Sequence, residues 1–329
     1  MASAPPAERW LLIESHIPWP RDALTTLYRT AHAAPHPPTP AEESVGPQTS
    51  PAGARAEAAS PQLPSGDGAR VESDGQQALP ALGESLALEV LRLCAAAHVR
   101  PVLIRRPGRV DRTALRRWAL VDSRPGQESI RWGELPTDEH LLNVLAGIDP
   151  GKPSTEPIYL VCTHGRHDAC CAIRGRPAAA ALAAVHPDRT WECSHIGGDR
   201  FAANLVFLPH SLFYGHVPES RAVELARQYD EGLVVPDLFR GSGAFSQPVQ
   251  AAQHFAREAG LSRAVDGLRP IEVRELTRDH WQVRLAADGQ VVTVEVQAEL
   301  ITINGSMTCA SRPPGRVRQF NLAAEIHTS

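Results

Sequence analysis

The chain has 329 residues, six of them cysteines, and a formal net charge of −4. This length suffices for about two domains of ordinary size. The negative charge argues against a nucleic-acid partner, because binding to a polyanion depends on a concentrated basic surface.

The N-terminal region is predicted to form a small α/β domain that a polar segment interrupts. Its expected strands and helices lie at residues 10–14, 22–28, 83–98, 101–104, 118–122, 129–132 and 138–146. Residues 33–79 consist largely of Pro, Ala, Ser, Gly and Glu. They have too few large apolar side chains for burial to offset the conformational entropy lost on folding. We therefore expect a disordered insertion at 33–79 and one α/β domain formed by residues 1–32 and 80–150.

The N-terminus lacks the features of an export signal. Glu8 and Arg9 lie where a signal peptide needs an apolar core, and no apolar run reaches the length of a membrane span. These features predict a cytoplasmic protein with no membrane partner. Thiols stay reduced in that compartment, so clustered cysteines there more often bind metal or exchange electrons than form structural disulfides.

A run of arginines follows the strand expected at 101–104. Its members are Arg105, Arg106, Arg109, Arg112, Arg116 and Arg117. We interpret it first as a solvated strand and loop, and second as a surface for an acidic redox partner.

A second α/β domain is expected at residues 155–260, after a Gly/Pro/Ser-containing linker at 147–156. Its elements are predicted at residues 158–161, 175–185, 190–195, 203–208, 213–217, 219–229, 234–239 and 247–259. Gly175 and Pro177 mark the expected start of the first helix. A strand, a helix, three strands and a helix are typical of a thioredoxin-like layer, in which helices pack on a mixed sheet.

The C-terminal residues 268–329 are predicted to form an antiparallel β extension. Its strands are expected at 271–276, 280–286, 290–296 and 300–303. Asp288 and Gly289 form a strong hairpin-turn signal between two of them.

Most of the chemically informative side chains lie between residues 157 and 217. Cys162 and Cys171 are separated by eight residues, enough for a loop to curl back and offer two thiolates to one metal centre. Cys193 and His195 stand two apart on a predicted strand, so their side chains leave the same face. These four residues have the number and softness of ligands for zinc or for an iron-sulfur cluster. The long cysteine spacing favours a 2Fe-2S cluster, with zinc as the alternative. The neighbouring His164 is expected to be a solvated loop residue.

The segments that carry these residues read CTHGRHDACCAIRGRP and WECSHIGGDRFAANLVFLP, followed by LFYGHV and LVVPDLFRG. They resemble the sucrase/ferredoxin-like family, a group of thioredoxin-like 2Fe-2S ferredoxins. The resemblance runs from the strand at 10–14 to the segment near Cys309 and is densest over residues 162–217. It implies an electron carrier with a cluster-bearing, thioredoxin-like domain and a redox partner protein that these residues do not identify.

The resemblance covers three of the four implied ligands. Cys162, Cys171 and His195 match, but where family members read His-x-Gly-Gly-His this chain ends the motif on Asp199. Cys193 and Asp199 compete for the fourth position. Cys193 is the first choice, because thiolate is the softer ligand and a shared strand face would place it beside His195.

The leading functional hypothesis is therefore an electron-transfer protein with one 2Fe-2S cluster. Two alternatives stay open: a metal-free thiol oxidoreductase acting through Cys170 or Cys171, and a zinc-stabilised binding module. No GxSxG, P-loop or dinucleotide fingerprint supports a self-contained hydrolase, kinase or dehydrogenase.

Overall fold

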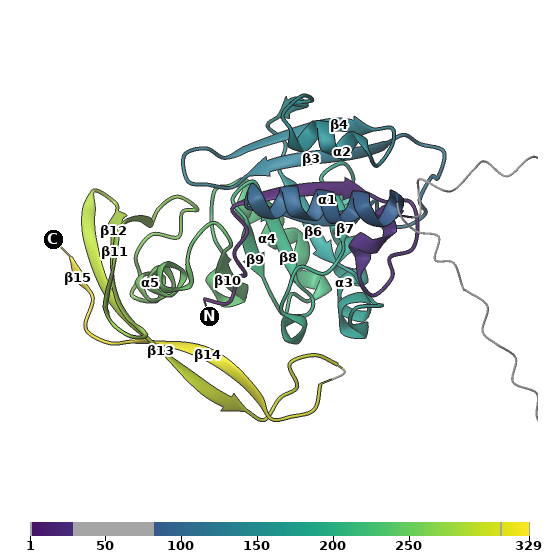
Figure 1. The fold of residues 1–329 in the computed structure, drawn as a ribbon. Coiled ribbons are helices and arrows are strands. Elements are labelled where there is room, and N and C mark those ends of the chain that lie inside the picture. Colours follow the sequence, from purple (N-terminus) through teal and green to yellow (C-terminus); the bar gives the residue numbers. More distant parts are fainter. Residues whose placement is uncertain (1, 29–81, 310, 329) are drawn as a thin grey trace, which may run out of the picture.

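The computed structural model describes residues 2–28, 82–309 and 311–328 (Figure 1). The predicted disordered insertion at 33–79 lies outside the described residues. The predicted fold class is confirmed, because helices pack on a large mixed sheet and a separate antiparallel sheet follows at the C-terminus. None of the helices in the described part of the chain combines the length and apolarity of a membrane span.

The first half of the large sheet is a βαβ unit extended by antiparallel strands. Its elements are β1 (Arg9–Glu14), the 3-10 helix η1 (Ala23–Tyr28), α1 (Leu82–Ala96), β2 (Val99–Arg105), β3 (Arg116–Asp122), β4 (Ser129–Leu135), α2 (His140–Leu145) and β5 (Lys152–Ser154). Strand β1 pairs with β2 in parallel and with β3 antiparallel. Strands β4 and β5 continue the sheet antiparallel.

The second half repeats this connectivity. Its elements are β6 (Ile158–Cys162), α3 (Ala169–Val185), β7 (Thr190–Cys193), η2 (Asp199–Phe201), β8 (Leu205–Leu208), β9 (Leu212–Tyr214), α4 (Glu219–Asp230), η3 (Pro236–Leu238) and β10 (Phe239–Ser242). Strand β6 pairs with β7 in parallel and with β8 antiparallel, and β9 and β10 follow. Strands β6 to β9 therefore correspond in topology to β1 to β4.

The two halves join through equivalent strands. The last residues of β2 and β7 pair antiparallel, with Ile104 opposite Cys193 and Arg105 opposite Glu192. This pairing joins the two halves into one ten-stranded sheet. An approximate two-fold axis therefore passes near this pair. The predicted linker at 147–156 separates the halves along the chain, but it also supplies β5, so the two predicted α/β domains share one sheet.

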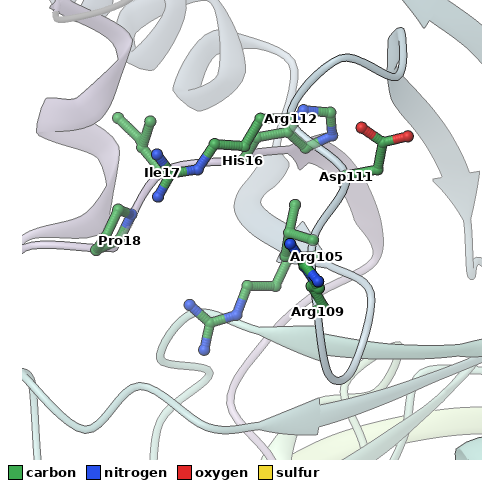
Figure 2. A pocket seen from close by; sticks show the side chains of 8 residues that line it. His16, Ile17, Pro18, Arg105, Arg109, Asp111 and Arg112 are labelled. Atoms are coloured by element: carbon green, nitrogen blue, oxygen red, sulfur yellow. The ribbon is translucent and has the colours of Figure 1, made fainter. Parts of the chain in front are cut away.

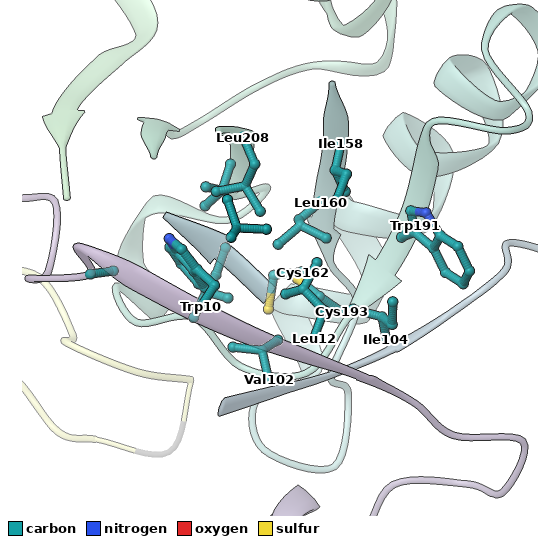
Figure 3. Packing of buried hydrophobic residues seen from close by; sticks show 14 of the residues in the cluster. Trp10, Leu12, Val102, Ile104, Ile158, Leu160, Cys162, Trp191, Cys193 and Leu208 are labelled. Carbon is teal, nitrogen blue, oxygen red and sulfur yellow. The ribbon is translucent and has the colours of Figure 1, made fainter. Parts of the chain in front are cut away.

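The large sheet buries an apolar cluster in which the cysteines are embedded. Figure 3 shows Cys162 and Cys193 among side chains from β1, β2, β6 and β7, including Trp10, Leu12 and Leu160. The parallel strands bury side chains on both faces, which explains their nearly continuous apolar sequences.

Helix α3 begins earlier than predicted. The helix expected from Gly175 starts at Ala169, because the Asp168 side chain accepts a hydrogen bond from the Cys170 N–H and caps it. Pro177 consequently lies inside the helix rather than at its start. Gly175 serves packing: a Cβ atom there would lie 2.1 Å from the carbonyl oxygen of Cys162.

We expect Gly175→Ala to destabilise the protein by about 2 kcal/mol, because the added methyl group forces α3 away from β6. The free energy of unfolding in urea measures this effect. Gly305→Ala is the matched control, since its Cβ would meet no atom closer than 3.9 Å. Equal stability of the two variants would contradict the tight helix–strand contact.

The C-terminal extension is antiparallel, as predicted. Its strands are β11 (Arg269–Thr277), β12 (His280–Ala287), β13 (Gln290–Ile303), β14 (Gly315–Leu322) and β15 (His327–Thr328). The helix predicted at 247–259 as part of the second α/β domain, α5 (Gln247–Glu258), belongs instead to the core of this sheet. The strands predicted at 290–296 and 300–303 are one continuous strand, β13. Helix α5 packs on this sheet through Val249, Ala252 and Ala256. The loop between β13 and β14, in yellow in Figure 1, extends away from α5 toward the α3 side of the molecule.

Candidate metal centre

Three of the predicted ligands converge at the carboxyl ends of β6 and β7. Cys162 ends β6, Cys171 lies in the first turn of α3, and His195 follows β7. One ligand atom of each residue lies within 4.8 Å of those of the other two. Neighbouring parallel strands end at the same edge of a sheet, which is why residues distant in the sequence meet here.

Asp199 lies beside this group and forms a second one with His195 and His167. One of its carboxylate oxygens, Oδ1, lies 3.6 Å from Cys171 Sγ and 3.0 Å from His195 Nδ1. The side chain is buried, held in the short helix η2. A buried carboxylate beside a thiol and an imidazole is a suitable fourth ligand for a metal.

Cys193 lies outside the group. Strand β7 ends at this residue, so the strand predicted to 195 is too long and the expectation that Cys193 and His195 share a strand face is wrong. The Cys193 thiol packs among apolar side chains (Figure 3), where burial raises its pKa well above the usual value. Among the described residues, no group of three or more ligand-type side chains includes it. Of the two candidates for the fourth position, only Asp199 therefore lies beside Cys171 and His195.

Hydrogen bonds and ring stacking position His195. Its Nε2 accepts a hydrogen bond from the Gly197 N–H at 3.1 Å, and its ring stacks on His167 with 3.9 Å between centroids. The backbone N–H of His195 donates to Nδ1 of His164, whose Nε2 lies 2.6 Å from the Pro20 carbonyl oxygen. His195 Nδ1 is buried without an aligned hydrogen-bond partner, although Asp199 is near. Because Nε2 accepts, Nδ1 carries the proton of a neutral ring and faces Asp199, so it must release that proton before it can bind a metal.

His164 was missed by the sequence analysis as a positioning residue. It is buried rather than solvated, and its ring lies edge-on to Trp19. Because its Nε2 faces a carbonyl oxygen, that nitrogen carries the proton and Nδ1 is free to accept. His164 thereby links the loop after β1 to the loop after β7. No local signal in the sequence distinguishes it from other loop histidines.

The two cysteines of the group differ in their readiness to ionise. The neighbouring Cys171 thiol, together with His195, holds the pKa of Cys162 well below its usual value despite burial. The same contact and then burial raise the pKa of Cys171. Thiolate is the form that binds metal, so Cys162 is prepared for ligation.

Buried arginines lie next to the candidate ligands. Arg240 donates to Asn204 Oδ1 at 2.6 Å and to the Gly197 carbonyl at 3.2 Å, and burial lowers its pKa to about 9. Arg100 also has a lowered pKa because of burial, an effect that the nearby Cys193 and Cys162 thiols oppose. Burying cations is costly unless negative charge is close. Two thiolates and one carboxylate at the candidate centre would supply that charge.

The Gly-Gly pair of the motif makes room for Arg240. Gly197 and Gly198 both have positive φ, and a Cβ atom on Gly198 would lie 2.5 Å from Arg240 Nη2. Arg240 lies in the LVVPDLFRG segment, but no local pattern there indicates a role at the site. The pair therefore brings a buried cation up to the segment that joins His195 to Asp199.

Solvent reaches the centre through a hollow of about 470 Å³. It is lined by histidines, among them His164, His167 and His195, with Ser194 and residues of the loop that contains Arg21. The imidazole of His195 therefore lies between the buried thiols and the surface. The hollow therefore gives solvent a route to the His195 side of the site.

A larger hollow, of about 800 Å³, occupies the equivalent place in the first half (Figure 2). It lies between the loops that follow β1 and β2, and its lining includes His16, Arg105, Arg109 and Arg112. Arg109 and Arg112 are exposed, as the solvated interpretation of the basic run predicts. Arg105 instead pairs with Glu192 at 2.6 Å. None of the described residues that line this hollow is a cysteine.

Asp168 connects the N-terminus of α3 with the C-terminal extension. Its carboxylate accepts hydrogen bonds from the N–H groups of Cys170 and Cys309. Although burial raises the pKa of Asp168, contacts with the thiol and N–H of Cys309, and then with those of Cys170, prevail and lower it to about 2. A lowered carboxyl pKa stabilises the folded protein above the pKa of the unfolded chain and ceases to do so as the pH falls through the folded value.

We accordingly expect Asp168→Asn to cost about 1 kcal/mol of stability at neutral pH, the usual size of a lost helix cap. The difference from the parent protein should shrink between about pH 4 and pH 2, as the parent carboxylate is protonated. Unfolding midpoints measured across this range test the expectation. Asp288→Asn, in a hairpin turn that suits either residue, should show no such dependence.

The fold and this group define an α/β protein with a buried thiol, imidazole and carboxylate site suited to a soft or borderline metal ion. A family model described as sucrase/ferredoxin-like matches residues 1–241. The chain belongs to the sucrase/ferredoxin-like family. No curated protein and no solved structure matches the chain. The matched region contains both halves of the large sheet and all four residues of the candidate centre.

Proposed function

We propose that the protein is an electron carrier that binds one 2Fe-2S cluster through Cys162, Cys171, His195 and Asp199. The observation that carries the proposal is the convergence of Cys162, Cys171 and His195, whose ligand atoms lie within 4.8 Å of one another, with Asp199 beside two of them. When bound, such a cluster accepts and releases single electrons. Membership of the sucrase/ferredoxin-like family supports the same assignment.

The surrounding residues have definable roles in this function. His164 and Gly197 orient the His195 ring through hydrogen bonds. Arg240 and Arg100 offset negative charge on the ligands. The apolar cluster around Cys162 limits the access of water to the thiolates, leaving the histidine-lined hollow as the side facing solvent.

An electron carrier also needs a redox partner. The exposed Arg109 and Arg112 at the basic hollow (Figure 2) would complement an acidic protein surface. We therefore propose that the partner is acidic at its contact face.

The decisive experiment is metal and sulfide analysis of protein made without oxygen, combined with absorption and electron paramagnetic resonance spectroscopy. About two irons and two acid-labile sulfides per chain are expected, with a paramagnetic signal that appears on one-electron reduction. Colourless protein without iron would contradict the proposal.

A single zinc ion is the second candidate, because the ligand atoms of Cys162, Cys171 and His195 lie compactly within 4.8 Å. Zinc binds such mixed sets in tetrahedral geometry. The same analysis would then return about one zinc per chain and no reducible centre, and the protein would be a zinc-stabilised binding module.

The metal-free thiol oxidoreductase is less well supported. Burial and then Asp168 raise the pKa of Cys170 to about 12, and the pKa of Cys171 is raised as well. Nucleophilic catalysis needs thiolate at neutral pH. Thiol–disulfide exchange that survives chelation and disappears in Cys171→Ser would favour this function.

A further inference from the structure

The loop between β13 and β14 touches the segments that carry the candidate ligands. The Cys309 N–H donates to Asp168 Oδ2 at 2.7 Å, at the start of α3. Arg200, the neighbour of Asp199 in η2, lies with Nη1 3.7 Å from Met307 Sδ. This loop is outside the region that the family model matches.

The contact brings together two thiols that are far apart in the sequence. The ligand-type atoms of Asp168, Cys170 and Cys309 all lie within 4.8 Å of one another. Both cysteines are free, with Cys170 half-buried and Cys309 exposed. Because Asp168 accepts hydrogen bonds from both backbone N–H groups, it holds the two cysteines close together.

A disulfide suits this group better than a metal ion. Both carboxylate oxygens of Asp168 already accept backbone hydrogen bonds, which leaves little ligating capacity. The two sulfur atoms lie within 4.8 Å of each other, so the loop has to bring them closer by at most about 2.8 Å to reach the length of a disulfide bond. Cys170 Sγ also lies 3.4 Å from the carbonyl oxygen of Asp199, so a bond at this position would join the loop to the rim of the candidate centre.

We propose that Cys170 and Cys309 form a reversible disulfide that fastens the β13–β14 loop to the segments carrying Cys171 and Asp199. The oxidant is a small-molecule disulfide such as oxidised glutathione. Exposed Cys309 reacts first: its thiolate attacks the external disulfide, a mixed disulfide forms, and one small thiolate leaves. The Cys170 thiol then releases its proton and attacks the Cys309 sulfur, displacing the second small thiolate, in an uncatalysed step that reaches equilibrium over minutes to hours.

The exchange balances in atoms and electrons. Two protein thiols are oxidised to one disulfide, and one external disulfide is reduced to two thiols, which take up the two protons. Excess reduced thiol reverses the reaction. The loop is thereby fastened under oxidising conditions and released under reducing ones, whichever metal the neighbouring site holds.

The test equilibrates the full-length protein, as purified, with defined ratios of oxidised to reduced glutathione. After alkylation of the remaining thiols, tryptic digestion without reductant should yield a linked pair of peptides, residues 167–174 and 285–316. The pair should disappear on treatment with dithiothreitol and in Cys170→Ser or Cys309→Ser. Cys94→Ser is the matched control, because Cys94 is buried in another cluster, and it should keep the link.

Hydrogen exchange provides a second measurement. Amide exchange at residues 304–309 should slow at least several-fold in the oxidised parent protein and stay unchanged in Cys309→Ser. Three outcomes would overturn the proposal: a stable glutathione adduct on Cys309 alone, a link between Cys170 and Cys171, or zinc bound by thiols that resist oxidation. Metal content, measured on the same sample, reports separately on the proposed electron-transfer function.

Discussion

Cys162→Ser is expected to abolish metal binding, whereas Cys193→Ala is expected to retain it. The two residues are direct partners on neighbouring parallel strands, and both are fully buried. Only Cys162 belongs to the group of converging ligand atoms, and its lowered pKa favours the thiolate that a metal requires. The loss of affinity should exceed about 100-fold, more than the usual effect of a change outside the ligand shell.

Metal content per chain after purification without oxygen checks this expectation. Cys193→Ala removes one sulfur from a packed apolar cluster, so it should cost about 1 kcal/mol of stability without altering the absorption spectrum. Circular dichroism confirms that each variant folds. A colourless Cys193→Ala together with a coloured Cys162→Ser would reverse the ligand assignment.

Asp199→Ala is expected to lose the metal centre. Asp199→His is expected to retain it with a higher reduction potential. Asp199 lies within reach of Cys171 Sγ and His195 Nδ1, so its loss removes the fourth ligand. A histidine at this position supplies a nitrogen in place of a carboxylate oxygen. Because it also removes one negative charge from the ligand set, the reduction potential should rise by on the order of 100 mV.

A spectroelectrochemical titration of the parent and the Asp199→His variant measures this shift. Asp188→His is a suitable control, since Asp188 is exposed in the loop after α3 and lies in no ligand group of the described residues. Full metal occupancy and an unchanged spectrum in Asp199→Ala would exclude aspartate as the fourth ligand.

The two halves of the large sheet share a topology but differ in chemistry. The position that Cys162 occupies at the end of β6 corresponds to Glu14 at the end of β1, because each pairs with the equivalent position of the neighbouring parallel strand. Glu14 accepts a hydrogen bond from the Arg117 N–H. The first half therefore has an arginine-lined hollow where the second half gathers thiols and imidazole.

Local patterns in the sequence predicted most of the helices and strands and three residues of the candidate site, but not β5, β14 or β15. Apolar runs such as those of β1 and β6 predict buried strands, and Asp288-Gly289 predicts a hairpin because positive φ is needed at that turn. The clustering of Cys162, Cys171 and His195 indicates a metal site because soft side chains at the ends of rigid elements are typical ligands. The start of α3 was misplaced because the Asp168 cap was overlooked.

Only the tertiary structure shows that Asp199 lies beside Cys171 and His195, whereas Cys193 belongs to no ligand group of the described residues. Period-two alternation holds while a strand continues, and β7 ends at Cys193, so the chain turns through Gly197 and Gly198 and carries Asp199 back to His195. The joining of the two halves through β2 and β7, and the contact of Cys309 with Asp168, likewise depend on pairings between residues far apart in the chain. Such contacts leave no periodic pattern in the sequence, because they depend on how distant elements pack together and not on neighbouring residues in the chain.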